Sequence, residues 1–189
     1  ASKSGVYTIT NTVDSPCAGL TATASVTIAG ETWNGSVNSS WDNPANWSCG
    51  FVPYPATSVQ IPDVTVDPVI STGMTGEAAD IALAPGATLS IADGTLRIYG
   101  SASGSGTIDA TSGTVEFSGT EPQTTGGSLF AGGRVMNLNV NNASGVSLID
   151  PLNVTGVVYV QAGNLASDGF LTLLSEAAGT ALIDGSGSG

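Results

Sequence analysis

The sequence predicts an all-β protein whose main part is a right-handed parallel β-helix, a β-solenoid in which the chain winds through stacked coils of short strands. Apolar residues recur at every second position in short stretches, and Gly, Pro, Asp or Asn separates these stretches, as turn-rich β-structure requires. No helix of useful length is expected. A pattern of three successive apolar pairs, spread over about 22 positions, occurs twice in the sequence, which is typical of a repeat architecture. The two copies comprise Ile81, Leu83, Leu89, Ile91, Leu96 and Ile98, and then Leu138, Val140, Val146, Leu148, Leu152 and Val154.

The composition argues against several classes of function. Of the 189 residues, 41% are hydrophobic and only 10% are charged, with Lys3, Arg97 and Arg134 against fifteen acidic residues and a net charge of −12. Nucleic acids and anionic membranes are bound by clustered Lys and Arg, so neither partner is expected. No apolar run is long enough to predict insertion into a membrane. The chain has no His, which removes the usual general base and the commonest transition-metal ligand.

Residues 1–29 are predicted to form a separate unit of two strands, over residues 6–10 and 20–28, joined by a loop that contains Pro16 and Gly19. Two strands alone are marginally stable in water. The segment resembles the closing hairpin of an immunoglobulin-like or PKD-like sandwich. The alternative is a free hairpin packed against the end of the solenoid.

Residues 30–58 are predicted to form a tryptophan-rich cap at the start of the solenoid. Trp33, Trp41 and Trp47 lie within fifteen residues, among Asn-Gly and Asn-Pro turn sequences. A first coil without a cap would expose its apolar core and its unpaired strand edges. The alternative is an aromatic platform on which the three indoles stack against a sugar.

The solenoid itself is predicted over residues 59–184, followed by a Gly/Ser linker or truncation point at residues 185–189. Pro62 and Pro68 would disrupt a central strand, so they indicate strand ends or corners of the first coil, which is expected to include residues 64–70. Glycines open many of the later strands. The stretch from Gly119 to Gly133 is expected to be an irregular coil.

Several motifs resemble large surface proteins of Bacteroidetes-type bacteria. They include Trp33-x-Gly35, Ser40-Trp41, Asn46-Trp47-Ser48-Cys49-Gly50, Val59-x-Ile61-Pro62, Gly119-Thr120 and Leu138-Asn139-Val140-Asn141-Asn142. The resemblance implies a multi-domain adhesin or gliding-associated protein that is exported by type IX secretion to the cell surface. It also implies that the partners are other domains of the same polypeptide, surface glycans, or proteins of the export machinery and outer membrane. It offers no catalytic motif.

The two cysteines, Cys17 and Cys49, could form one disulfide in an oxidising extracellular setting, joining the first unit to the cap. The alternative is that Cys17 pairs with a residue in a missing part of its own sandwich, which leaves Cys49 free or buried.

Acidic residues allow two further hypotheses, which the patterns favour less than solvated turns. Asp63 and Asp67, with Asp42 and Asn43 upstream, could supply oxygen ligands for Ca²⁺, but no EF-hand spacing is present, and no other cofactor is expected. A glycosidase would need two carboxylates facing one cleft. The candidates for catalysis are the carboxylates of Asp93, Asp109 and Glu116, and, for a lyase, the basic side chains of Arg97 and Arg134.

The sequence therefore favours a non-enzymatic structural or adhesive stalk over a carbohydrate-binding module or an accessory region of a polysaccharide-degrading enzyme. Accessibility of the three indoles separates these two interpretations, because stacking on a sugar requires an exposed ring face.

Overall fold

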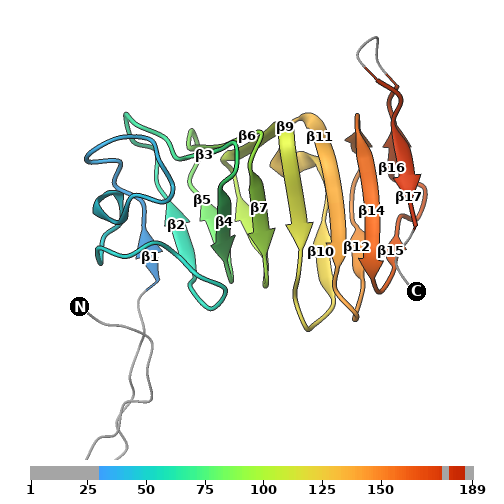
Figure 1. Cartoon of the computed structure of the whole chain (residues 1–189), viewed down its shortest axis with the longest axis horizontal. Helices are drawn as coiled ribbons and strands as arrows, with labels where there is room; N and C mark the ends of the chain where they lie inside the picture. Colours follow the sequence, from blue (N-terminus) through green and yellow to red (C-terminus); the bar gives the residue numbers. More distant parts are fainter. Residues whose placement is uncertain (1–29, 176–178, 186–189) are drawn as a thin grey trace, which may run out of the picture.

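The computed structural model describes residues 30–175 and 179–185, and this part of the chain is a β-solenoid of about six turns (Figure 1). The predicted fold class is confirmed: strands of successive turns pair in parallel, and the helical elements among the described residues are two short 3₁₀ segments. The 3₁₀ segments are η1 (Pro44–Asn46) and η2 (Gly127–Leu129). The strands are β1 (Glu31–Thr32), β2 (Val59–Ile61), β3 (Val69–Ser71), β4 (Thr75–Ala78), β5 (Ile81–Leu83), β6 (Thr88–Ala92), β7 (Thr95–Ile98), β8 (Ala102–Gly104), β9 (Thr107–Phe117), β10 (Gln123–Thr125), β11 (Phe130–Asn141), β12 (Val146–Leu148), β13 (Leu152–Val154), β14 (Val157–Ala162), β15 (Leu165–Ala166), β16 (Leu171–Leu173) and β17 (Leu182–Asp184).

Each turn contributes one strand to each of three faces. The first face contains β1, β2, β5, β8, β10, β12 and β15, and the second contains β3, β6, the start of β9, the start of β11, β13 and β16. The third face contains β4, β7, the ends of β9 and β11, β14 and β17. From β2 onward, register partners lie 19 positions apart at the closest, as in Leu89 and Ile108, and 25 at the most, as in Val157 and Leu182.

The repeated apolar pattern is real, but its two copies begin on different faces. Ile81 opens β5 on the first face, whereas Leu138 lies in the part of β11 that belongs to the third face. Both copies span three consecutive strands, so the three-strand coil was predicted correctly. The two copies can start on different faces because apolar residues alternate in the same way on all three.

The prolines bound strands as expected. β2 ends directly before Pro62, and β3 begins directly after Pro68, because Pro has no N–H to donate to a neighbouring strand. Residues 62–68 contain no strand and form a corner of the first turn. The irregular stretch from Gly119 to Gly133 contains β10, η2 and the start of β11, and the first face is interrupted between β8 and β10.

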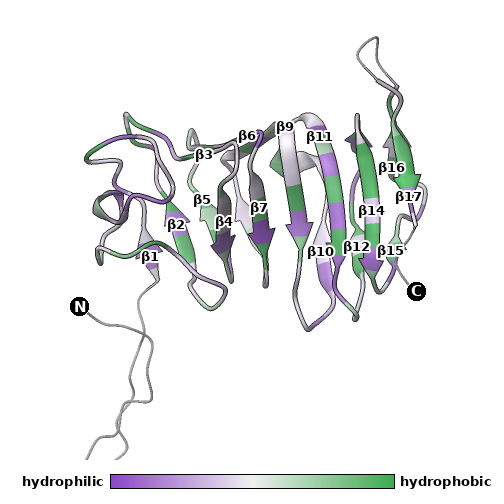
Figure 2. Ribbon diagram, viewed as in Figure 1, coloured by the Kyte–Doolittle hydropathy of each residue, from purple (hydrophilic) through white to green (hydrophobic). Residues whose placement is uncertain are grey.

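The core runs along the axis of the solenoid. Buried and partly exposed residues alternate along the strands, as expected when successive side chains point to opposite faces. Figure 2 shows bands of apolar and polar residues on the ribbon. The inward residues form one continuous apolar cluster that extends from the tryptophans to Val158.

The predicted cap is continuous with the solenoid. β1 pairs with β2 in parallel, and Ser40 forms a bridge with Val69 of the second face. The hairpin predicted for residues 1–29 and the last four residues lie outside the described part. No helix within the described residues is long and apolar enough to cross a membrane.

Candidate functional site

The three tryptophans pack against one another at the N-terminal end of the core. Trp33, Trp41 and Trp47 are 0%, 1% and 2% exposed, respectively. Trp47 lies between the other two and makes edge-to-face contacts with both, at ring-centroid distances of 5.0 Å to Trp33 and 4.8 Å to Trp41. Such geometry is the preferred packing of aromatic rings in a core.

Hydrogen bonds fix two of the indoles. The Trp33 Nε1–H donates to the carbonyl of Val66 at 2.7 Å, and the Trp47 Nε1–H donates to the carbonyl of Trp41 at 2.8 Å. The Nε1 of Trp41 is buried and has no hydrogen-bond partner in the structure. The ring faces that a sugar would need are thus covered by protein, so the geometry of these indoles is that of a cap and not of a stacking platform.

A buried amide, Asn46, organises the loop around the indoles. Its Oδ1 accepts from the backbone N–H groups of Val37 and Asn38 at 3.0 and 3.1 Å. Its Nδ2 donates to Asn38 Oδ1 at 2.8 Å and to the carbonyl of Ser40 at 2.9 Å. The amide thereby satisfies buried polar groups that the turn would otherwise leave unpaired.

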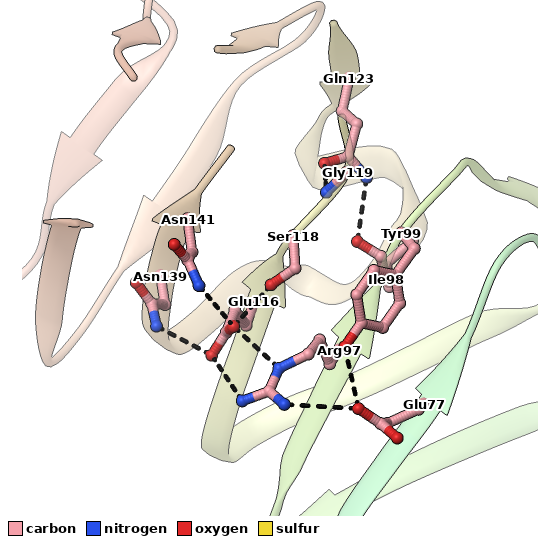
Figure 3. Close-up of polar contacts among 10 residues, drawn as sticks. All are labelled: Glu77, Arg97, Ile98, Tyr99, Glu116, Ser118, Gly119, Gln123, Asn139 and Asn141. Atoms are coloured by element: carbon pink, nitrogen blue, oxygen red, sulfur yellow. Dashed lines mark hydrogen bonds and ion pairs between the residues drawn. The ribbon is translucent and has the colours of Figure 1, made fainter. Parts of the chain in front are cut away.

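A group of charged side chains that form ion pairs lies on the outside of the third face. Glu77, Arg97, Glu116 and Asn139 are register partners on consecutive turns, and we call these four residues the outer ladder. Figure 3 shows Arg97 between the two carboxylates, with Tyr99 beside it. Although Glu116 points away from the core, it is only 5% exposed.

Arg97 binds both carboxylates of the outer ladder. Its Nε–H donates to Glu116 Oε1 at 2.8 Å, and its Nη2–H donates to Glu116 Oε2 at 3.3 Å. Its Nη1–H reaches Glu77 Oε1 at 3.4 Å, and the Tyr99 hydroxyl donates to the same oxygen at 2.9 Å. The two-point contact with Glu116 is the stronger kind of charge-assisted hydrogen bond.

Further donors surround the Glu116 carboxylate. Ser118 Oγ–H donates to Oε1 at 2.5 Å, Asn139 Nδ2–H to Oε2 at 2.9 Å, and Asn141 Nδ2–H to Oε1 at 3.3 Å (Figure 3). Burial acts to raise the pKa of Glu116, but the hydrogen bonds from Ser118, Arg97 and Asn141 outweigh it, and the pKa lies below its ordinary value. Hydrogen bonding to Glu116 raises the pKa of Arg97. The carboxylate is therefore held ionised, which suits a clamp between turns and not a general acid.

The other carboxylates proposed as catalytic do not converge on Glu116. Asp109 lies on the second face, in register with Ser90, and Asp93 lies at the corner between β6 and β7 with a φ of +59°. The two basic candidates lie on different strands. Arg97 is on β7, and Arg134 is on β11, where its register partner is Asn153.

Two of the residues considered for Ca²⁺, Asp42 and Asn43, serve local turns, whereas Oδ1 of Asp67 is buried without a hydrogen-bond partner in the structure. Asp42 Oδ1 accepts from Ser40 Oγ at 2.6 Å, and Asn43 Oδ1 caps η1 by accepting from the N–H of Ala45 at 3.0 Å. Asp63 lies against the tight turn at Gly86. Among the described residues, no group of three His, Cys, Asp or Glu side chains has the geometry to hold a metal ion.

Cys49 is exposed at the edge of the cap, and its N–H donates to Oε2 of the buried Glu31 at 2.9 Å. Cys17 lies outside the described residues, so a disulfide between the two remains a prediction.

Sequence reasoning missed Gln123, which bridges the interruption of the first face. Its side-chain Nε2–H donates to the carbonyls of Ile98 at 3.0 Å and Gly100 at 2.7 Å. Its Oε1 accepts from the N–H of Gly119 and from Asn142 Nδ2, both at 2.9 Å. Gln123 occupies an inward position that Val146 fills on the next turn. The available signal was a polar residue directly after Pro122, within the stretch expected to be irregular.

Residues 32–115 are similar to a family described as a domain of unknown function (DUF8693). The match includes the three tryptophans and Arg97, and it ends one residue before Glu116. Comparisons with curated proteins and with solved structures gave no match.

Proposed function

We propose that the chain is a non-enzymatic structural module, a stiff stalk or adhesive segment of a larger secreted or cell-surface protein. The observation that carries the proposal is the uninterrupted column of buried inward residues, closed at its N-terminal end by packed tryptophans. At about 4.8 Å between paired strands, six turns give a rod roughly 30 Å long.

Contacts between turns support a mechanical role. Backbone hydrogen bonds join each turn to the next, and polar side chains add links on the outside. Besides the outer ladder, Asp80 Oδ1 accepts from the N–H and Oγ–H of Ser101 on the next turn, at 2.9 and 2.8 Å. Asp150 Oδ2 accepts from Ser128 Oγ on the preceding turn at 2.6 Å. These links make the surface of the rod resistant to local opening.

The motifs that resemble Bacteroidetes-type surface proteins extend the proposal to an extracellular site and to export by type IX secretion. In that setting the partners would be other domains of the same polypeptide, surface glycans, and proteins of the export machinery or outer membrane. The acidic composition, with a net charge of −12, suits an exported protein.

Tryptophan fluorescence tests the proposal directly, because all three tryptophans belong to the cap. We expect blue-shifted emission that acrylamide quenches poorly and that no soluble polysaccharide changes. Solvent-exposed emission that shifts with one glycan would overturn the structural assignment and favour a carbohydrate-binding module. Limited proteolysis supplies a second measurement: a stalk should leave the segment 30–175 intact at protease concentrations that digest an unfolded control.

A further inference from the structure

The outer surface of the third face carries a row of polar side chains from five consecutive turns. Tyr159 on β14 is the register partner of Asn139, so it extends the outer ladder by one turn. The strands that carry the row, β4, β7, β9, β11 and β14, follow one another along the solenoid in Figure 1. Because paired strands lie about 4.8 Å apart, the row from Glu77 to Tyr159 is roughly 19 Å long.

The contacts within this row leave part of its hydrogen-bonding capacity unused. Glu77 accepts at Oε1 only, its Oε2 has no partner among the described residues, and its side chain is 29% exposed. Arg97 donates three of its five N–H groups to the two carboxylates, and its side chain is 33% exposed. The row therefore presents a free acceptor and at least one free donor on neighbouring turns.

The next two turns add further polar atoms without partners. Asn141 is exposed, and its Nδ2–H donates to Glu116 while its Oδ1 accepts no hydrogen bond within the described part of the chain. The Oδ1 of Asn139 is buried and also has no partner. The hydroxyl of the partly exposed Tyr159 forms no hydrogen bond with the residues that the structure describes. Polar atoms of this kind are normally satisfied by water or by a ligand.

The charges of the row favour a neutral ligand. Glu77 and Glu116 carry two negative charges and Arg97 carries one positive charge, so the row has a net charge of −1 on a chain of −12. An acidic polymer would be repelled, whereas a polymer rich in hydroxyl groups would not. Each hydroxyl both donates and accepts, so it can bind the free acceptors and the free donor of the row alike.

We propose that this surface binds a neutral β-1,4-linked polysaccharide whose chain lies along the axis of the solenoid. In such an extended chain each sugar ring advances by nearly the separation of two paired strands, so successive sugars meet successive turns. The partly exposed rings of Tyr99 and Tyr159 offer apolar surface to the C–H side of a sugar ring. The inference rests on the proposed role as an adhesive segment, for which it names the ligand and the surface that binds it.

Isothermal titration calorimetry of the full chain with short oligosaccharides tests this inference. Cellohexaose, mannohexaose and xylohexaose are the extended neutral probes, maltohexaose is a neutral probe with a curved chain, and an oligogalacturonate of the same length is an acidic one. We expect at least one extended probe to bind about tenfold or more tightly than the curved and acidic probes. Tryptophan emission should stay unchanged on binding, because the three indoles lie inside the core.

Matched Ala substitutions locate the site. Tyr159→Ala and Asn141→Ala should each raise the Kd of the extended probe at least about fivefold, since each removes a partner of the sugar chain. Gln60→Ala is the control, because Gln60 is an exposed polar residue of β2 on the first face, and it should leave the Kd unchanged. Melting curves confirm that each variant is folded.

Three results would overturn the proposal: no binding of any extended probe, binding that survives both substitutions on the third face, or equal affinity for the curved or acidic probe. A loss of binding on Gln60→Ala would likewise place the site elsewhere and contradict it. If limited proteolysis leaves the segment 30–175 intact while no probe binds, the stalk stands and this inference alone fails.

Discussion

Arg97 and Glu116 are register partners on neighbouring turns, and the Arg97 Nε–H donates to Glu116 Oε1 at 2.8 Å on the outer surface of the third face. The pair buries a carboxylate on the outside of a sheet, where solvated side chains are the rule. Since Arg97 also reaches Glu77, one guanidinium links three consecutive turns. The outer ladder thus adds side-chain contacts to the backbone pairing along the axis.

Replacing Arg97 tests how much this link contributes. Arg97→Met should lower the free energy of unfolding by about 1.5–3 kcal/mol, because a buried ionised carboxylate loses its charged donor. Urea unfolding measures the change. In the double variant Arg97→Met/Glu116→Gln, the loss should be smaller than the sum of the two single losses. Additive losses would show that the two side chains contribute independently.

The lowered pKa of Glu116 predicts a dependence of stability on pH. A carboxyl with a lower pKa in the folded state stabilises the fold above its ordinary value of 4.5, and it loses that contribution as the pH falls through the folded pKa. The stability difference between the wild type and Glu116→Gln should therefore be greatest near neutral pH and should shrink below about pH 4.5. Unfolding curves from pH 7 to pH 3 measure it. A difference that stays constant over this range would contradict the ionised clamp.

Trp47 holds the cap together because it contacts both other indoles. Trp47→Ala should cost about 3–5 kcal/mol, the usual effect of truncating a fully buried aromatic residue. In a stack where each turn touches only its neighbours, hydrogen exchange should quicken first at β1 and β2 and least at β13 and β14. Phe51→Ala, at a partly exposed ring outside the trio, is the control. Equal acceleration in all turns would instead indicate a single cooperative unit.

Ala substitutions at Gly104 and Gly73 distinguish the cost of a steric clash from the cost of backbone strain. Both have a positive φ, +122° and +77°. A Cβ on Gly104 would lie 2.0 Å from the carbonyl oxygen of Leu83 on the previous turn, whereas a Cβ on Gly73 would meet nothing within 4 Å. Ala should therefore cost about 1–2 kcal/mol at Gly73, from backbone strain alone. At Gly104 it should cost a further 1–3 kcal/mol or so, because the turns must move apart. Thermal unfolding of the two variants compares them, and equal losses would show that the neighbouring turn yields freely.

Gln123 should stabilise the fold where the first face is interrupted. Gln123→Leu keeps the volume but leaves the carbonyls of Ile98 and Gly100 and the N–H of Gly119 without their partner. Each buried group left unpaired costs about 1–3 kcal/mol, so we expect a total loss above about 2 kcal/mol. Gln60→Leu, at an exposed position of β2, should change stability by less than about 0.5 kcal/mol. Faster exchange of the Gly119 amide in the first variant alone would identify the lost bond.

The three-strand coil could be predicted from the sequence because it depends on local patterns, namely the alternation of apolar residues and the positions of prolines. Alternating apolar residues specify which side chains face inward, and Pro62 and Pro68 bound their strands because they cannot donate a hydrogen bond. The phase of the two apolar copies was not predictable in this way, since a strand on one face has the same alternation as a strand on another. The face on which each copy begins depends on the corners that precede it, and these corners differ in length.

The polar sites were harder to predict because they depend on register between turns. Glu116 is an ordinary outward residue in the pattern, and only the pairing of β7, β9 and β11 brings Arg97 and Asn139 to its two sides. The three tryptophans were recognisable from their density within one segment. Their burial was a prediction of the cap hypothesis, whereas the buried amide of Asn46 depends on the path of the loop.

The parallel pairing of β2, β5 and the later strands also determines how the rod would respond to tension. Strands run around the axis, so the backbone hydrogen bonds lie nearly along it, and a pull on the two ends loads one layer of bonds at a time. Layers would open in sequence and not together. Each layer that detaches releases about twenty residues, or roughly 60 Å of slack chain for a rise of about 5 Å. Such a module would dissipate work gradually and keep its remaining turns folded while the tether lengthens.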